Sequence, residues 1–125
     1  MAQHSPRFLE IAEKATKNIT ECGLDEVKRN LEEKKPVVLI DCREDREWQV
    51  DHIPSAVHIG KGVIERDIEV KVPDVNAEIV IYCGGGFRSA LAAESLQKMG
   101  YRKVKSMAGG IRAWRDAGLP LQKPK

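Results

Sequence analysis

The sequence predicts an α/β fold in which helices cover both faces of a mostly parallel sheet. Short apolar runs of strand length alternate along the chain with longer segments whose apolar residues recur at helical spacing. The 125 residues have room for one domain with a real core, and they contain no internal repeat or low-complexity segment. This alternation is typical of a parallel sheet packed between helices.

The strands are predicted from four short apolar or β-branched runs. They span residues 37–40, 57–59, 79–82 and 103–105. The run Ile79-Val80-Ile81-Tyr82 is apolar enough to be covered on both faces, as strands in the middle of a parallel sheet are.

The helices are predicted from apolar residues at a period of 3.6. At the N-terminus, Ser5-Pro6 resembles an N-cap followed by proline at the first helical position, and an amphipathic pattern follows as far as Ile19. Further helices are predicted at residues 24–33, at 64–69, from residue 87 or 88 to Gly100, and at 111–117 before Gly118.

The loop after the strand at residues 79–82 is the most informative segment for function. Cys83 ends the strand, the three glycines 84–86 follow, and the helical pattern begins at Phe87 or Arg88. Glycines let several backbone N–H groups point at one centre, here the Cys83 sulfur, while the helix start and Arg88 add positive charge. The sequence therefore predicts a thiol that ionises easily and acts as a nucleophile.

The residues of this loop are open to two other interpretations. Cys83 could be a packed core cysteine before a glycine turn, but packing requires neither three glycines nor an arginine. The loop could also bind nucleotide phosphates, but the Lys-Ser/Thr pair of such loops is missing. The nucleophilic interpretation accounts for more of the segment than either.

A second candidate segment follows the strand at residues 37–40. Asp41, like Cys83, falls at the carboxyl end of a predicted parallel strand, where ligands bind in such sheets. Asp41 and Arg43 could border the pocket and support the site, with Asp41 accepting hydrogen bonds from the loop. Alternatively, Asp41 caps a turn and Arg43 pairs with Glu47 at helical spacing. The sequence leaves both possibilities open.

Charge and hydropathy exclude several functional classes. Lysine and arginine together number 21, and aspartate and glutamate 19, which gives a net charge of +2. Charges of both signs favour solubility and argue against a dedicated nucleic-acid surface. No apolar run approaches the roughly 18 residues of a membrane span, and the N-terminus lacks the apolar core of a signal peptide. We expect a cytoplasmic protein with no nucleic-acid and no membrane partner.

The cysteines argue against a structural role in disulfides or metal binding. There are three of them, Cys22, Cys42 and Cys83, without regular spacing, which disfavours a disulfide framework and a zinc site. Cys42 stands at a strand end and Cys22 in a polar stretch before a glycine. We expect both to be bystanders, and we expect no metal and no other cofactor.

Four motifs, in order, make the sequence similar to the single-domain rhodanese family of thiosulfate sulfurtransferase type. They are Leu39-Ile40-Asp41-Cys42-Arg43, Asp51-His52-Ile53-Pro54-Ser55-Ala56, Tyr82-Cys83 with the loop to Arg88-Ser89, and Gly109-Gly110-Ile111 with Trp114, Gly118 and Pro120. Ser55 replaces the usual glycine and Cys42 the usual aliphatic residue, and neither departure is expected to touch the chemistry. The resemblance implies a three-layer sandwich at residues 19–122, preceded by a helical extension at residues 1–18.

The resemblance also implies a persulfide cycle. The Cys83 thiolate would take sulfane sulfur from a donor such as thiosulfate or a persulfide and pass it to cyanide, a thiol or a sulfur-carrier protein. The substrate-binding residues would be those of the loop, namely Gly84, Gly85, Gly86, Phe87, Arg88 and Ser89. His52 and His58 are expected to be structural, because fixed dipoles can activate the thiol without a base. The protein would be a monomer or a homodimer.

Two alternatives to a sulfurtransferase share this resemblance. Related phosphatases and arsenate reductases have one residue more between cysteine and arginine, whereas only four residues separate Cys83 from Arg88 here. This length favours sulfur over phosphate. A non-catalytic module that binds partners or carries sulfur is the other alternative, but such modules often lack the cysteine that this chain keeps.

Overall fold

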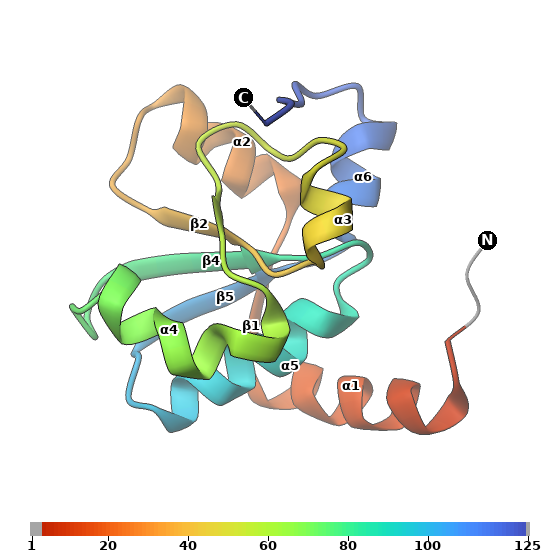
Figure 1. Cartoon of the computed structure of the whole chain (residues 1–125), viewed down its shortest axis with the longest axis vertical. Helices are drawn as coiled ribbons and strands as arrows, with labels where there is room; N and C mark the ends of the chain where they lie inside the picture. The colour runs from red at the N-terminus through yellow and green to blue at the C-terminus, as the bar shows by residue number, and fades with distance from the viewer. Residues whose placement is uncertain (1–3, 125) are drawn as a thin grey trace.

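The computed structural model describes residues 4–124 and has three layers, with a parallel sheet in the middle (Figure 1). The sheet has five strands in the order β1-β5-β4-β2-β3, and every pair of neighbours is parallel. The strands are β1 (Thr20–Cys22), β2 (Val38–Asp41), β3 (Val57–His58), β4 (Glu78–Tyr82) and β5 (Lys103–Met107). The α/β sandwich predicted from the sequence is confirmed.

Helices cover both faces of this sheet. They are α1 (Pro6–Asn18), α2 (Leu24–Glu32), α3 (Asp45–Trp48), α4 (Ile64–Lys71) preceded by the 3₁₀ turn η1 (Lys61–Val63), α5 (Phe87–Lys98) and α6 (Gly110–Asp116). In Figure 1, α2 and α6 lie on one side of the sheet, and α1, α4 and α5 on the other. The predicted N-terminal helix is present as α1, which packs on α5, while residues 1–3 of the predicted extension lie outside the described residues.

The alternation of side chains along β4 divides the core into two halves. Ile79 and Ile81 belong to the half with α4 and α5, whereas Val80 and Tyr82 belong to the half with α2 and α6. Because β4 is apolar on both faces, it can occupy the middle of the sheet. Cys83 continues the alternation and falls in the half that contains α5.

The sequence patterns missed two elements, β1 and α3. β1 is a three-residue edge strand that begins with the exposed Thr20 and Glu21, so it carries no apolar run. It is held by pairing with β5. α3 has only four residues, too few to show a helical period. Both were recognisable only from their tertiary surroundings.

The order of the strands places a crevice above β2 and β4. From β2 the chain continues to β3 on one side, and from β4 it continues to β5 on the other side. The loops that leave these two neighbouring strands therefore diverge, which is the arrangement that creates binding sites at the carboxyl ends of parallel strands. Within residues 4–124, no helix is long and apolar enough to cross a membrane.

Candidate active site

Cys83 is a buried residue immediately after β4, at the carboxyl end of that strand. Its sulfur receives hydrogen bonds from the backbone N–H groups of Gly86, at 3.1 Å, and Ser89, at 3.3 Å. Gly86 has a φ of +103°, a conformation that glycine adopts readily, and this turn aims its N–H at the sulfur. Of the six loop residues proposed as contacts, these two direct backbone donors at the thiol itself.

The hydroxyl of Ser89 provides a third polar contact. Ser89 Oγ lies 3.5 Å from Cys83 Sγ and 2.8 Å from Ser106 Oγ, and both serines are fully buried. When the sulfur is a thiolate, it can only accept, so Ser89 donates to it and Ser106 in turn donates to Ser89. This relay from β5 fixes the orientation of the Ser89 hydroxyl.

Cys42 is a neighbour of Cys83, contrary to the expectation that it is a bystander. Its N–H donates to Tyr82 O at 3.0 Å, and the two cysteines belong to the same half of the core. The pKa of Cys83 is well below that of an ordinary thiol, with the Cys42 hydrogen bond the largest cause. The Ser89 hydroxyl and the two N–H groups act in the same direction, and together these donors outweigh the effect of burial, which raises the pKa. The sequence reasoning missed this residue because the contact depends on which strands are neighbours.

The motif Gly109-Gly110, at the start of α6, packs against the loop that follows Cys83. The N–H groups at the start of α6 donate to the loop carbonyls, Ile111 N to Cys83 O at 2.8 Å and Arg112 N to Gly84 O at 3.0 Å. Gly110 has a φ of +57°, and a Cβ at this position would lie 2.5 Å from Cys83 O. Only glycine permits α6 to approach the loop so closely.

Arg88 points to α3 rather than standing free. Its guanidinium makes two hydrogen bonds with the Glu47 carboxylate, at 2.7 and 3.2 Å. Burial raises the pKa of Glu47, but the bonds from Arg88 and from the Glu44 N–H lower it more, so it lies below the ordinary value. The ion pair links the loop after Cys83 to α3 and partly neutralises the positive charge of Arg88.

Asp41, the last residue of β2, forms a buried ion pair with Arg43. The Asp41 carboxylate accepts hydrogen bonds from the backbone N–H, Nε and Nη2 of Arg43, at 2.8 to 3.1 Å. Arg43 Nη2 also donates to the carbonyl of Asp51 at 2.6 Å. The bond from the Arg43 N–H confirms that Asp41 caps a turn, but its carboxylate binds Arg43 and not the loop after Cys83. The predicted pairing of Arg43 with Glu47 is wrong, because Glu47 is paired with Arg88.

His52 and His58 make contacts with neighbouring segments of the fold. His52 is buried, exchanges backbone hydrogen bonds with Gln122, and stacks on Trp48 at a ring separation of 3.6 Å. His58 lies at the end of β3 and contacts Arg43 O through Nε2 at 2.8 Å. Their contacts agree with the structural role expected for both.

A basic groove leads to the site. It has a volume of about 740 Å³ and reaches Cys42, at the end of the neighbouring strand, and Arg88, five residues after Cys83. Its lining residues come from the loops after β2 and β3, from η1, and from α3, α4 and α5: Cys42, Arg43, Glu44, Asp45, Arg46, Gly60, Lys61, Gly62, Val63, Arg66 and Arg88. Lys61 and four arginines outnumber the two acidic residues, so the groove favours anionic ligands.

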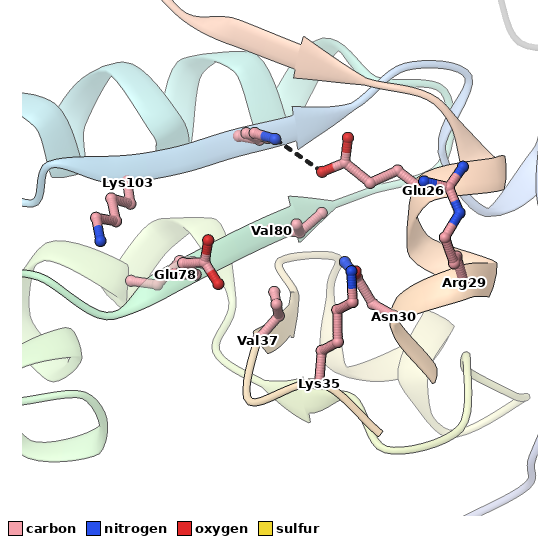
Figure 2. Close-up of a pocket in the computed structure, with 10 residues that line it drawn as sticks. Glu26, Arg29, Asn30, Lys35, Val37, Glu78, Val80 and Lys103 are labelled. Carbon is pink, nitrogen blue, oxygen red and sulfur yellow. Dashed lines mark hydrogen bonds and ion pairs between the residues drawn. The ribbon is translucent and has the colours of Figure 1, made fainter. Parts of the chain in front are cut away.

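A second cavity, of about 310 Å³, lies away from this chemistry (Figure 2). It is lined by residues of α2 and by the starts of β4 and β5, such as Glu78 and Lys103. One of its charges is already paired, because Glu26 accepts a hydrogen bond from Lys105 at 2.8 Å. It holds no thiol, so the groove beside Cys42 is the candidate substrate site.

Helix α1 contributes one wall beside the loop. Phe8 and His4 pack against the ring of Phe87, the first residue of α5, with ring centroids 6.3 and 4.9 Å away. The sequence suggested an amphipathic helix but did not place it here.

Within residues 4–124, no three His, Cys, Asp or Glu side chains gather closely enough to hold a metal ion.

Comparison with known proteins agrees with this architecture. The family model of the rhodanese-like domain matches residues 23–117. The chain is 34% identical over 97 residues to the putative sulfur carrier protein YrkF of Bacillus subtilis, covering 78% of this chain and about half, 51%, of that relative. It is 34% identical over 84 residues to the thiosulfate sulfurtransferase PspE of Escherichia coli, covering 67% of this chain and 77% of PspE.

One solved structure resembles nearly the entire chain. RPA3614 of Rhodopseudomonas palustris, a protein of unknown function described as a possible tyrosine phosphatase, superimposes with a TM-score of 0.82 and is 32% identical. The match covers 98% of this chain and 99% of that one. Since the family model covers well over half of the sequence, the protein belongs to the family of rhodanese-like domains.

Proposed function

We propose that the protein is a sulfurtransferase that carries sulfane sulfur as a persulfide on Cys83. The observation that carries this proposal is the convergence of two N–H groups and the Ser89 hydroxyl on the Cys83 sulfur. The same donors that stabilise a thiolate can stabilise a persulfide anion. The relatives named as a sulfur carrier and a thiosulfate sulfurtransferase support the reaction class.

The cycle has two displacement steps. The Cys83 thiolate attacks the outer sulfur of thiosulfate, the S–S bond breaks, and sulfite leaves with the bonding electron pair. A thiophilic acceptor such as cyanide or a thiol then attacks the outer sulfur of the persulfide, and the Cys83 thiolate leaves. A low pKa serves both steps, because it raises the fraction of attacking thiolate and makes Cys83 a better leaving group.

The groove suits small anionic donors. Arg88 and the other basic side chains of its lining attract a sulfonate, and a planar guanidinium can bind one through two hydrogen bonds. In the structure Glu47 occupies both of these donors. A donor that binds Arg88 must therefore compete with Glu47 or share the guanidinium with it.

Phosphate hydrolysis is the second candidate, because RPA3614 is described as a possible tyrosine phosphatase. Two features of this chain favour sulfur. The loop has only four residues between Cys83 and Arg88, and its N–H groups from Gly86 and Ser89 point at the sulfur itself. A tetrahedral phosphate needs a wider ring of donors around it than these contacts leave.

Steady-state transfer of sulfur from thiosulfate to cyanide tests the proposal. We expect the native protein to follow ping-pong kinetics, which is typical of a covalent intermediate, and to show negligible hydrolysis of aryl phosphates. Cys83→Ser should abolish transfer, whereas Cys22→Ser, on the opposite half of the core, should retain it. Efficient phosphate hydrolysis with no sulfur transfer would overturn the proposal.

A further inference from the structure

The two neighbouring strands β2 and β4 end in thiols that share one face of the sheet. Asp41 is in register with Tyr82, so the next residues along each strand, Cys42 and Cys83, are also neighbours. Side chains alternate along strands, and both thiols lie with Ile40 and Ile81 in the same half of the core. The pairing of strands thus brings two buried thiols together.

Their spacing is compatible with a covalent bond. Neighbouring strands lie about 4.7–4.9 Å apart, which falls within the range of about 4.4–6.8 Å between the Cα atoms of a disulfide. Cys42 and Cys83 are free buried thiols in the structure, and the hydrogen bond from Cys42 N–H to Tyr82 O at 3.0 Å holds the two strand ends together. To form a disulfide, only the two sulfurs need to approach each other. The order and pairing of the strands can stay as they are.

We propose that Cys42 is a second reactive thiol, which attacks Cys83 Sγ in the persulfide, expels the outer sulfur as hydrogen sulfide and leaves a Cys42–Cys83 disulfide. This inference rests on the proposed persulfide. The reaction balances without a further oxidant: the new S–S bond replaces the old one, and the outer sulfur leaves with the old bonding pair. The proton lost by Cys42 goes to the departing sulfide. A low-molecular-weight thiol then reduces the disulfide and completes a turnover.

Loading of Cys83 makes Cys42 more reactive. In the resting protein, the hydrogen bond to Cys83 is the largest cause that raises the pKa of Cys42, and burial and the Cys83 charge act in the same direction. Once Cys83 Sγ bears the second sulfur, the negative charge moves to the outer sulfur, so Sγ itself is no longer an anion and opposes ionisation of Cys42 less. The basic groove also reaches Cys42, so sulfide can leave and a reducing thiol can enter by this path.

Cys22 provides a matched control. It is also a buried free thiol, but it lies on β1 in the other half of the core. In the sheet order β1-β5-β4-β2, the strand β5 separates it from β4. Its removal should leave the reaction between Cys42 and Cys83 unchanged.

The experiment follows the fate of the loaded sulfur in the absence of an acceptor. The full chain is loaded anaerobically with thiosulfate or, in parallel, with inorganic polysulfide, and freed of donor. Released sulfide is then measured with time, and samples are alkylated under denaturing conditions for intact-mass and peptide analysis. Native protein, Cys42→Val, Cys42→Ala and Cys22→Ala are compared, after thermal unfolding has verified that each variant is folded.

We expect the native protein and Cys22→Ala to release one sulfide for each persulfide lost and to gain a Cys42–Cys83 disulfide. Both Cys42 variants should load but release sulfide at least about 100-fold more slowly, because an intramolecular thiol has a high effective concentration. A native persulfide that persists, or equal release by Cys42→Val, overturns the inference alone. Transfer of the sulfur to Cys42 without release also overturns it. If neither donor loads Cys83, the proposed function fails as well.

Discussion

At the scale of single residues, the site depends on which of two neighbouring thiols carries the negative charge. Cys83 Sγ accepts hydrogen bonds from the N–H groups of Gly86 and Ser89, whereas contact with Cys83 raises the pKa of Cys42. The charge therefore belongs on Cys83, and Cys42 acts as a hydrogen-bond donor. A residue that the sequence suggested was a bystander contributes the largest single effect on the pKa of Cys83.

Substitution of Cys42 tests this assignment. We expect the native Cys83 to react with iodoacetamide well below pH 8.5, about the pKa of an ordinary thiol, and Cys42→Val to shift the profile upward. The shift follows from the loss of the thiol hydrogen bond. Peptide mapping would assign the alkylated cysteine, and Cys22→Ala is the control. Identical profiles for native protein and Cys42→Val would contradict the role of Cys42.

The same pKa difference makes stability depend on pH. The pKa of Cys83 is lower in the folded chain than the roughly 8.5 of an unfolded thiol, so the thiolate stabilises the fold fully above that pH. This contribution is lost as the pH falls through the folded pKa. The free energy of unfolding in urea, compared between native protein and Cys83→Ser, should therefore show a native advantage that shrinks toward acidic pH. A difference independent of pH would contradict the depressed pKa.

Arg88 has two possible roles, which kinetics can separate. If it binds the sulfonate of thiosulfate, Arg88→Lys removes a charge-assisted hydrogen bond of about 1.5–3 kcal/mol, and kcat/KM falls roughly 10- to 150-fold, mainly through KM. An uncharged organic persulfide should be affected much less. If Arg88 instead serves to link the loop to α3, kcat/KM should fall equally for both donors.

Glu47→Gln gives the complementary measurement. It weakens the pair that occupies the guanidinium, so a donor-binding Arg88 becomes more available and KM for thiosulfate should decrease. KM for the uncharged persulfide should hardly change. An increase in KM for both donors would show that the ion pair is needed to shape the loop.

At the scale of elements, the loop from Cys83 to Arg88 is held between α5, which begins within it, and α6, whose first N–H groups donate hydrogen bonds to its carbonyls. Gly110→Ala should break this contact, because its Cβ would approach Cys83 O to 2.5 Å and Gly84 O to 2.6 Å. We expect a loss of stability of about 1–3 kcal/mol together with a large loss of sulfur transfer. Urea unfolding and the transfer assay measure the two effects.

Gly118→Ala is the matched control for backbone strain. Gly118 also has a positive φ, of +71°, but nothing lies within 4 Å of a Cβ at this position. It should cost only about 1 kcal/mol and leave the transfer rate unchanged. If both alanine variants behaved alike, the close approach of α6 to the loop would not matter for the site.

At the scale of the whole molecule, the sequence predicted the elements that carry apolar runs and the loop that carries the thiol. It could not decide the contacts that depend on strand order. Spacing along the sequence allowed Arg43 to pair with Glu47. In the structure, Arg43 pairs with the buried Asp41, and Glu47 of α3 pairs with Arg88. The neighbourhood of Cys42 and Cys83 follows from the β2–β4 register, which one strand by itself does not reveal.

Sulfur transfer as proposed depends on one atom, the sulfur of Cys83, and the intact mass of the protein tests its loading most directly. The reduced protein is exposed to thiosulfate, quenched at once and weighed, and the peptides are mapped. We predict a gain of one sulfur atom, located on Cys83, reversed by cyanide and absent from Cys83→Ser. No added sulfur with any sulfane donor, or a sulfur located first on Cys22 or Cys42, would contradict the account.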